Sequence, residues 1–436
     1  MAEILPLRAW RYSDEFSERI EELTAPLFDV VSVQQREQLY KNPYNAIHLS
    51  VPKNPFAIQN AEKTVQDWKR KGVIKQDKLP GIYVYYQYFR LPGEEKERCR
   101  KGFIIQIKAY DWDEGKILRH ENTIVSAVHD RVDLLAATKM QASPTHGLYV
   151  DEDFQLESDM EAAMSSPIYE VEDYQGVREV LAVIHDADVI RRFLSLLEKK
   201  QVILADGHHR LEGAIAYRKR MKGAFDDKKW KAHEYHLMYL TNAASDDLKI
   251  LPTHRLYSEL KMSKSEFFEK LSEWFLIKPF SDPEEMGTYT FRRVRKFGLL
   301  IENEGYIIEL KPELFDQVNQ GMPEVLRKLD LVILHEVLFW RILGIPLDEQ
   351  RTKENLVYER NFSKCLREVQ SGKASFAIIT RELEMAQVLD VCNSGYLMPQ
   401  KSTYFYPKAL SGLIFASIDQ DEFDFTYDAF FGKNKR

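Results

Sequence analysis

The chain has 436 residues, 44% of them hydrophobic and 30% charged, an ordinary globular composition with room for two or three domains. The formal net charge of −7 argues against a protein that coats nucleic acid, so we expect no nucleic-acid partner. The cysteines Cys99, Cys365 and Cys392 form no close pair and have no metal-ligand spacing, which indicates a reducing compartment. The first ten residues lack an apolar signal region, and no apolar stretch is long enough to span a membrane. We therefore expect a cytoplasmic protein.

The N-terminal half is predicted to alternate helices with strands. Apolar residues at helical spacing predict a helix over 14–24. Ser32 and Gln35 have the spacing of a capping box, so a second helix is expected to begin there and to end before the Asn-Pro pair at 42–43. The remaining predictions are strands over 47–51, 81–89, 102–110, 147–150 and 174–184, a strand end and loop over 115–123, and helices over 62–71, 126–140 and 188–200.

The C-terminal half begins with a predicted strand over 235–241 and changes its pattern near residue 258. We predict two regions, a core α/β region over 1–257 and a C-terminal α+β region over 258–436. Residues 432–436 are expected to be frayed. Within the C-terminal region we predict helices near 263–275 and 323–344, a hairpin over 297–310 and an apolar strand from Ser411.

The most informative segment joins a short apolar strand, 202–205, to a helix that follows an Asp-Gly turn. Backbone N–H groups and the positive end of the helix dipole point out of such a turn, which favours an anion such as phosphate. Arginine can hold phosphate oxygens with two N–H groups, and histidines can donate to the others. The predicted phosphate or nucleotide site consists of Gly207, His208, His209 and Arg210.

The alternative for this turn is purely structural, with histidines that only cap the helix or form local hydrogen bonds. Gathering this many polar groups directly after a buried strand is costly unless they have partners. An anion site is therefore the preferred interpretation.

Two carboxylates are candidates for catalysis. Glu121 follows His120 in a polar break after an apolar strand, and a carboxylate near phosphate can act as a general base toward a hydroxyl. Asp206 can bind Mg²⁺ or accept a proton. The alternatives are a surface acid in a loop for Glu121 and a residue that only fixes the turn for Asp206. Asp29 is a weaker candidate of the same kind.

A second anion-binding cluster is predicted near the C-terminus, where Lys401, Ser402 and Lys408 stand among aromatic residues. Lysines and hydroxyls can neutralise phosphates held at the first site, so we predict that this segment returns toward the turn. The alternative is a solvated basic loop. His254 and Arg255 form a third and weaker cluster.

Several familiar site patterns are missing from the sequence. It has no Walker P-loop, no dinucleotide-binding fingerprint and no nucleophile elbow. His335 and Glu336 lie in an apolar stretch without a second histidine at zinc-protease spacing, so we expect them to pack in the core. His233 and His236 are three residues apart but lack a clear third ligand, so we predict no metal site there. Metal ligands elsewhere stay open.

Six ordered motifs run through nearly the whole chain, at 26–31, 42–43, 119–123, 205–210, 251–255 and 398–408. In their order and composition they resemble the motifs of the family of domains of unknown function numbered 1015, DUF1015. Leu27-Phe28 stands where the family pattern has Pro-Tyr, and Leu211 stands where it has Tyr. Both departures are packing changes that leave the chemistry of the motifs intact.

The Asp-Gly-His-His-Arg turn is also similar, more distantly, to the phosphate-binding turn of the ParB/sulfiredoxin superfamily. That superfamily includes ParB-type CTP switches, sulfiredoxin and nucleotide-dependent free serine kinases. The resemblance implies that His208, His209 and Arg210 hold nucleotide phosphates and that Glu121 is the base. Because His208 stands in the neighbourhood of sulfiredoxin's catalytic cysteine, reduction of sulfinic acids is not expected.

These observations predict an α/β or α+β fold, a mixed sheet with a ParB/sulfiredoxin-like core elaborated by N- and C-terminal extensions. The predicted function is phosphoryl transfer from a nucleotide to a small hydroxyl-bearing metabolite, with serine as the first candidate. ATP or ADP, or another nucleotide, and Mg²⁺ are the expected cofactors. The alternatives are a ParB-type nucleotide-binding switch and a phosphate-ester hydrolase. The oligomeric state stays open, a homo-oligomer included.

Overall fold

The computed structural model describes residues 2–91, 94–225, 227–289, 294–318, 320–351, 353–399, 401–423 and 427–431. Its residues form two compact units. Unit 1 contains residues 1–249 and 407–436, and unit 2 contains residues 250–406. This division differs from the predicted one at 257/258, because the last segment of the chain belongs with the N-terminal region.

The returning C-terminal segment is part of the packing of unit 1. Strand β21 (Ala416–Ser417) pairs with β7 (Met140–Gln141), and Phe415 forms an antiparallel bridge with Trp10. The apolar strand predicted from Ser411 is therefore reduced to two residues of regular strand, and isolated bridges hold the rest.

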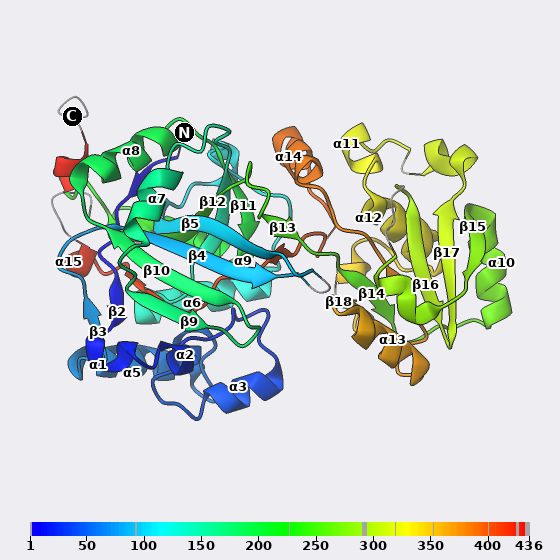
Figure 1. Cartoon of the computed structure of the whole chain (residues 1–436), viewed down its shortest axis with the longest axis horizontal. Helices are drawn as coiled ribbons and strands as arrows, with labels where there is room; N and C mark the ends of the chain where they lie inside the picture. The colour runs from blue at the N-terminus through cyan, green and yellow to red at the C-terminus, as the bar shows by residue number, and fades with distance from the viewer. Residues whose placement is uncertain are drawn as a thin grey trace. The chain divides into compact units, whose positions relative to one another are not determined.

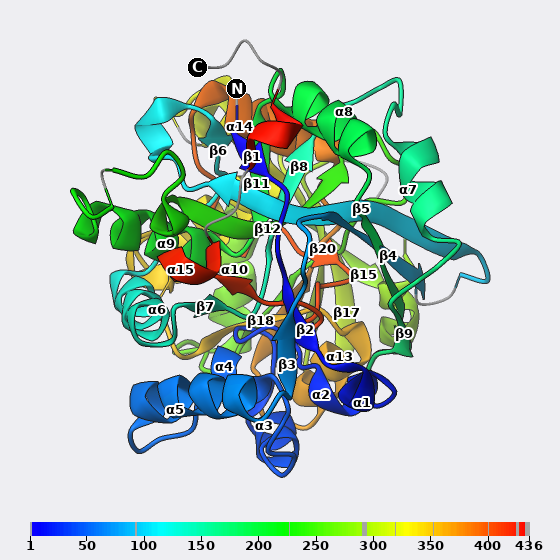
Figure 2. The same cartoon turned by 90° about the vertical axis from the view of Figure 1, so that its left-hand side faces the viewer.

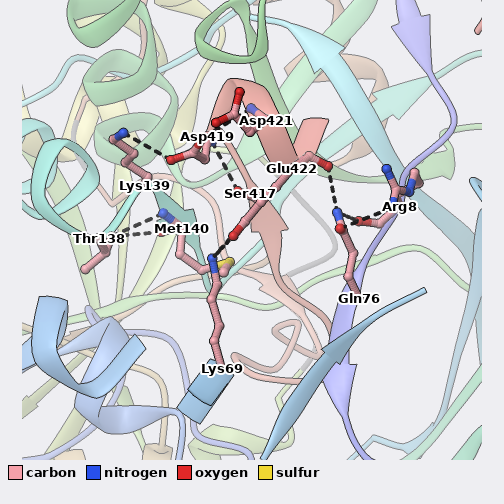
Figure 3. Close-up of polar contacts among 10 residues, drawn as sticks. All are labelled: Arg8, Lys69, Gln76, Thr138, Lys139, Met140, Ser417, Asp419, Asp421 and Glu422. Atoms are coloured by element: carbon pink, nitrogen blue, oxygen red, sulfur yellow. Dashed lines mark hydrogen bonds and ion pairs between the residues drawn. The ribbon is translucent and has the colours of Figure 1, made fainter. Parts of the chain in front are cut away.

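Polar contacts join the end of this segment to the N-terminal residues of unit 1 (Figure 3). In α15 (Gln420–Phe423), Glu422 accepts from Lys69 at 2.6 Å. One turn earlier, Asp419 pairs with Lys139 at 3.1 Å. Both carboxylates belong to the C-terminal segment and both lysines belong to N-terminal helices or their ends, so the contacts close unit 1 across the chain. The residues 432–436, predicted to be frayed, lie outside the described residues.

Unit 1 is built on a nine-stranded sheet of described residues, with the order β6-β11-β8-β12-β5-β4-β10-β9 and β1 beside β5. The pairs β11–β6 and β12–β8 are parallel and the others are antiparallel. The predicted mixed sheet is confirmed. Its strands are β1 (Ile4–Leu5), β4 (Ile82–Arg90), β5 (Glu97–Lys108), β6 (Ile117–Leu118), β8 (Thr145–Tyr149), β9 (Tyr169–Glu172), β10 (Arg178–Ile184), β11 (Val202–Asp206) and β12 (Tyr235–Asn242).

Both faces of this sheet are covered, which explains why β4 is apolar on both sides. Ile82 and Val84 belong to a core that includes α8 and α9, whereas Tyr83 and Tyr85 belong to the opposite core with α5. Figures 1 and 2 show α8 on one side of the sheet and α5 on the other. The main helices are α5 (Ala57–Arg70), α6 (Val125–Thr138), α7 (Glu157–Ala163), α8 (Ala187–Leu197) and α9 (His208–Arg220).

The first fifty residues form short elements. Ser32 caps α3 and forms the predicted capping box with Gln35. The predicted strand over 47–51 is wrong, because Asn45 accepts from the N–H of Ile47 at 2.8 Å and thereby fixes a helical turn. The elements here are α1 (Asp14–Ser17), α2 (Ile20–Leu23), α3 (Val33–Leu39), α4 (Ile47–Ser50) and the paired strands β2 (Trp10–Tyr12) and β3 (Ile74–Gln76).

Unit 2 has a six-stranded antiparallel sheet of described residues, in the order β15-β17-β16-β19-β14-β18. The predicted hairpin over 297–310 is confirmed as β16 and β17. The strands are β14 (His254–Tyr257), β15 (Phe275–Phe280), β16 (Lys296–Ile301), β17 (Glu304–Leu310), β18 (Leu356–Glu359) and β19 (Phe376–Ile379).

The helices of unit 2 include one that is irregular. The predicted helix over 323–344 is divided into two short α-helices and a stretch with π-helical hydrogen bonding, η5 (Leu334–Ile342). Within the described residues, no helix is both long and apolar enough to cross a membrane. The helices are α10 (Lys264–Trp274), α11 (Glu324–Arg327), α12 (Asp330–Ile333), α13 (Phe362–Gln370) and α14 (Met385–Ser394).

Candidate functional site

The candidate site lies where β11 ends and α9 begins, as the sequence predicts. Asp206 is the last residue of β11, and Gly207, with φ of +89°, precedes α9. A Cβ atom on Gly207 would lie 2.7 Å from Cγ2 of Thr145 and 2.8 Å from Nη2 of Arg210. The left-handed backbone and these close approaches both require glycine. The turn therefore lies directly against the guanidinium of Arg210.

Asp206 is buried and accepts hydrogen bonds from two cations. Nη2 of Arg210 donates to Oδ2 at 2.8 Å, and Nζ of Lys408 donates to Oδ1. Arg210 also donates from Nη1 to the carbonyl of Pro144. Burial alone would raise the pKa of Asp206, but the charges of Lys408 and Arg210 hold this pKa well below its usual range. Asp206 is therefore ionised at physiological pH, and Arg210 acts first on the protein's own turn.

Histidines surround the first turn of α9 and are mostly uncharged. The rings of His120 and His208 meet edge to face, with centroids 4.8 Å apart. Burial lowers the pKa of His120 to about 4 and that of His208 well below its ordinary value. Nε2 of His208 is buried and has no hydrogen-bond partner among the described residues. His208 thus offers a neutral imidazole nitrogen that lacks a hydrogen-bond partner among the described residues.

The segment that carries Glu121 is attached to α9 on both sides of the carboxylate. His120 packs against His208, and the N–H of Ile124 donates to Nε2 of His209 at 2.9 Å. Glu121 itself is half-buried in the bend between these two contacts. The structure therefore brings the segment of the predicted general base to the predicted phosphate turn, although their elements are separated by more than eighty residues in sequence.

A buried polar network holds the backbone next to Lys408. Nε2 of Gln87 donates to the carbonyl of Lys408 and to Oε1 of Glu179, each at 3.1 Å. Arg100 donates to Gln87 and to the carbonyl of Pro407. Burial raises the pKa of Glu179 to about 8. This network fixes the main chain of residues 407 and 408 on the sheet, and so positions the ammonium group that binds Asp206.

The other predicted anion-binding residues belong to unit 2. Lys401 is exposed and has a φ of +56°. Ser402 is buried and donates from Oγ to the carbonyl of Pro399 at 2.5 Å. Of the predicted C-terminal cluster, the structure thus brings Lys408 to the turn, whereas the roles of Lys401 and Ser402 stay predictions. Gln400, which directly precedes Lys401, lies outside the described residues.

The weaker candidates are explained by packing. His335 is buried in η5, where Nδ1 contacts Oε1 of Gln350 at 2.5 Å and Nε2 contacts Arg255 at 3.3 Å. His233 lies in a short 3-10 turn and His236 on β12, so they do not share a helix face. No group of three metal-ligating side chains occurs in the part of the chain that the structure describes.

Some members of the site were not predicted from the sequence. Among them are Pro144 and Thr145, which contact Arg210 and the turn, and His146, which pairs with Asp206 across β8 and β11. A Ser-Pro-Thr-His sequence at the start of a strand is the only signal they give. These residues reach the turn only because β8 pairs with β11, and no local sequence pattern predicts that pairing.

Comparison with known proteins identifies the family. A family model described as a protein of unknown function (DUF1015) matches residues 4–332. The chain belongs to the DUF1015 family. No curated protein matches this member of the family. The resemblance to this family is therefore confirmed, and the motif at 398–408 lies outside the matched residues.

Solved structures give weaker similarity to this DUF1015 chain. A free serine kinase in complex with AMP is 13% identical, with a TM-score of 0.35 and coverage of 71% of this chain and 92% of that one. A conserved hypothetical protein from Pyrococcus furiosus is 12% identical, with a TM-score of 0.35 and coverage of 72% and 95%. SbnI from Staphylococcus aureus, truncated at its C-terminus, is 9% identical, with a TM-score of 0.35 and coverage of 73% and 90%. At these TM-scores the ParB/sulfiredoxin-like core stays a prediction.

Proposed function

We propose that the turn between β11 and α9 binds the phosphates of a nucleotide, ATP or ADP in the first instance, and that the protein transfers a phosphoryl group to a small hydroxyl-bearing metabolite. The observation that carries this proposal is the buried Nε2 of His208, which has no partner among the described residues at the start of a thirteen-residue helix. Backbone N–H groups at such a helix start favour phosphate oxygens.

The charges of the turn fit this use. Asp206 shares its carboxylate between Arg210 and Lys408, so the three side chains together carry one net positive charge. A cation of this kind beside a helix N-terminus attracts an anionic ligand. His208 is neutral, so it contributes a hydrogen-bonding nitrogen and not a charge. The proposed binding thus relies on the helix terminus, one net charge and neutral donors.

Glu121 is the proposed general base toward the hydroxyl of the acceptor. Its segment is attached to α9 through His120 and through the backbone N–H of Ile124. Phosphoryl transfer depends mainly on positioning and charge stabilisation, and a carboxylate that orients the attacking hydroxyl is the protein's main addition. The distant resemblance to free serine kinases makes serine the first acceptor to test.

Asp206 does not fit as a ligand of Mg²⁺. Both of its oxygens already accept from cationic groups, Lys408 on one and Arg210 on the other. A divalent cation at this carboxylate would be repelled by both. Mg²⁺ is therefore proposed to arrive with the nucleotide, whose phosphates bind it, and no step is assigned to it here.

The test is calorimetric titration of ATP, ADP and CTP, each with Mg²⁺, into the full chain and two histidine variants. His208→Gln removes the neutral imidazole at the turn, and His129→Gln removes an exposed imidazole on α6 as a matched control. We expect one nucleotide to bind the wild type and the His129→Gln variant alike. We expect His208→Gln to weaken that binding about tenfold, the effect of about 1.4 kcal/mol.

Transfer is tested separately by following phosphorylated product from serine and other small alcohols. Glu121→Gln is expected to retain nucleotide binding and to lose transfer by at least about 100-fold, the usual contribution of a general base. Nucleotide binding without transfer to any acceptor would favour a switch of the ParB type. Release of phosphate from a phosphate ester without a nucleotide would favour a hydrolase. Absence of binding by every nucleotide would reject the proposal.

A further inference from the structure

A small cavity lies behind the turn, between α4, α6, β7 and the first turn of α9. Its volume is about 60 Å³ and its walls include Leu49 and Leu134. A water molecule needs about 10–15 Å³ by this kind of measure, so the space holds a few waters or one small group. The cavity is partly open to solvent, so a small ligand can enter it.

Two arginines line this cavity from opposite elements. Arg131 of α6 donates from Nη1 to the carbonyl of Ser50 at 2.8 Å, and its guanidinium lies 4.6 Å from the centre of the Phe28 ring. Its carboxylate partner, Asp130, is 57% exposed, whereas the Arg131 side chain is 13% exposed. Water therefore screens the carboxylate much more than the guanidinium, and Arg131 remains positive toward the cavity.

The second arginine is Arg210, whose charge is only partly balanced. It shares the carboxylate of Asp206 with Lys408, so two cations are set against one anion. Together with Arg131 and its screened partner, these side chains give the walls of the cavity a net positive charge. A monoanion inside the cavity would balance that charge.

Three residues that line the cavity also carry buried polar atoms without a hydrogen-bond partner among the described residues. They are Nε of Arg210, Nδ1 of His236 and Oγ of Ser50. They come from three different elements, α9, β12 and α4. Burial lowers the pKa of His236 to about 3, so its imidazole is neutral. Nε of Arg210 and Oγ of Ser50 are donors, so a ligand with acceptor oxygens would offset the cost of leaving them unpaired, whereas Nδ1 of His236 is an acceptor because Nε2 donates to Thr145.

We propose that this cavity binds the carboxylate group of a small molecule. A carboxylate carries the single negative charge that the walls lack, and its planar oxygens match a guanidinium. Oγ of Ser50 and Nε of Arg210 supply further donors. The cavity is small, so the carboxylate enters with at most a short substituent. This inference concerns binding alone and does not require the proposed phosphoryl transfer.

The carboxylate has two sources, which the experiment separates. It belongs either to the metabolite that accepts the phosphoryl group or to an independent small acid that binds as an effector. Acetate probes the carboxylate by itself, and L-lactate probes a carboxylate with a neighbouring hydroxyl. Acetamide and lactamide are neutral ligands of almost the same shape, and they test whether the charge is required.

The experiment titrates these four compounds into the full chain in a buffer of low chloride. The first variant is Arg131→Gln, and its matched control is Arg178→Gln. Arg178 also pairs with one carboxylate, Glu170 at 3.1 Å, and lies over one ring, that of Tyr88. We expect the carboxylates to bind the wild type and Arg178→Gln equally. We expect Arg131→Gln to weaken them at least tenfold, and the amides to show no binding.

A second variant keeps the proposal testable if Arg131→Gln fails to fold. Ala142→Val adds two methyl groups to the cavity wall and removes no charge. We expect it to abolish carboxylate binding without lowering the melting temperature. Tighter binding of lactate than acetate only with nucleotide present would assign the carboxylate to the acceptor, and equal binding would assign it to an effector. No carboxylate binding by the wild type, or equal binding by Arg131→Gln, overturns the proposal.

Discussion

Each of the two units buries an arginine, and the two arginines are balanced in different ways. Arg210 of unit 1 is 8% exposed and pairs with the carboxylate of Asp206. Arg255 of unit 2 is fully buried and contacts no carboxylate among the described residues. It donates instead to the carbonyl of Thr253 and contacts Nε2 of His335. Burial lowers its pKa to about 10, so it remains a cation at neutral pH.

The charge of Arg210 holds a turn together, whereas the charge of Arg255 is buried within a sheet. Asp206, Arg210 and Lys408 join β11, α9 and the C-terminal segment at the start of a helix. Arg255 is a strand residue between β18 and β19, held by neutral acceptors. Removing one partner of a buried ion pair strongly destabilises a protein, because the remaining buried charge is then uncompensated. Removing the carboxylate beside Arg210 should therefore cost much more stability than removing Arg255.

The largest effect is expected for Asp206→Asn. The variant leaves Arg210 and Lys408 without their carboxylate, and breaking such a buried pair typically costs about 3–5 kcal/mol. The measurement is urea unfolding followed by circular dichroism. Glu170→Gln removes an exposed partner of Arg178 and should cost less than about 1 kcal/mol. Equal costs for the two variants would contradict the role of Asp206 as the buried counter-ion of Arg210 and Lys408.

Acidification should lower the free energy of unfolding of both units. The pKa of His120 in unit 1 and of His254 in unit 2 is about 4 because both are buried, against 6.5 in an unfolded chain. As pH falls below 6.5, the unfolded chain binds the protons first, so stability decreases until about pH 4. Between pH 7 and pH 5 each histidine should cost about 2 kcal/mol.

The pH effect is measured as the midpoint of urea unfolding across that range, with His120→Gln and His254→Gln as separate variants. Each substitution should flatten the pH dependence of the unit that carries it. A profile that stays unchanged in both variants would contradict the depressed pKa values of these buried imidazoles.

The smallest effect is expected for Arg255→Met. The change removes a buried charge that has no carboxylate to leave behind, and methionine fills irregular apolar space well. Loss of the bond to Thr253 opposes that gain, so the free energy of unfolding should change by about 1 kcal/mol or less. Urea unfolding of this variant beside Asp206→Asn measures the contrast directly. A cost above about 3 kcal/mol would mean that an anion compensates Arg255.

The local part of the site was predictable and the long-range part was not. The strand, the Asp-Gly turn and the helix after Gly207 follow from short sequence patterns, because hydrophobic periodicity and turn residues act over a few positions. The partner of Asp206 at position 408 is 202 residues away in sequence. Residue chemistry predicted that the lysine-rich segment returns, but not that its lysine binds the carboxylate instead of a phosphate.

The errors in the predicted fold have the same origin. Residues 47–51 are predicted as a strand, but the side chain of Asn45 accepts from the N–H of Ile47 and stabilises a helical turn. The predicted boundary at 257/258 lies eight residues from the observed one at 249/250. The return of residues 407–436 to unit 1 had no local signal, since its regular strand is only two residues long.

The position of Lys408 also sets an order of events during synthesis. The ribosome releases Asp206 and Arg210 long before Lys408, and the whole of unit 2 is made in the interval. A nascent chain therefore carries the turn with one of its two cations until all of unit 2 has been made. Any ligand that needs both cations can be bound only after residue 408 has been made, so a shorter nascent chain cannot bind that ligand at the turn.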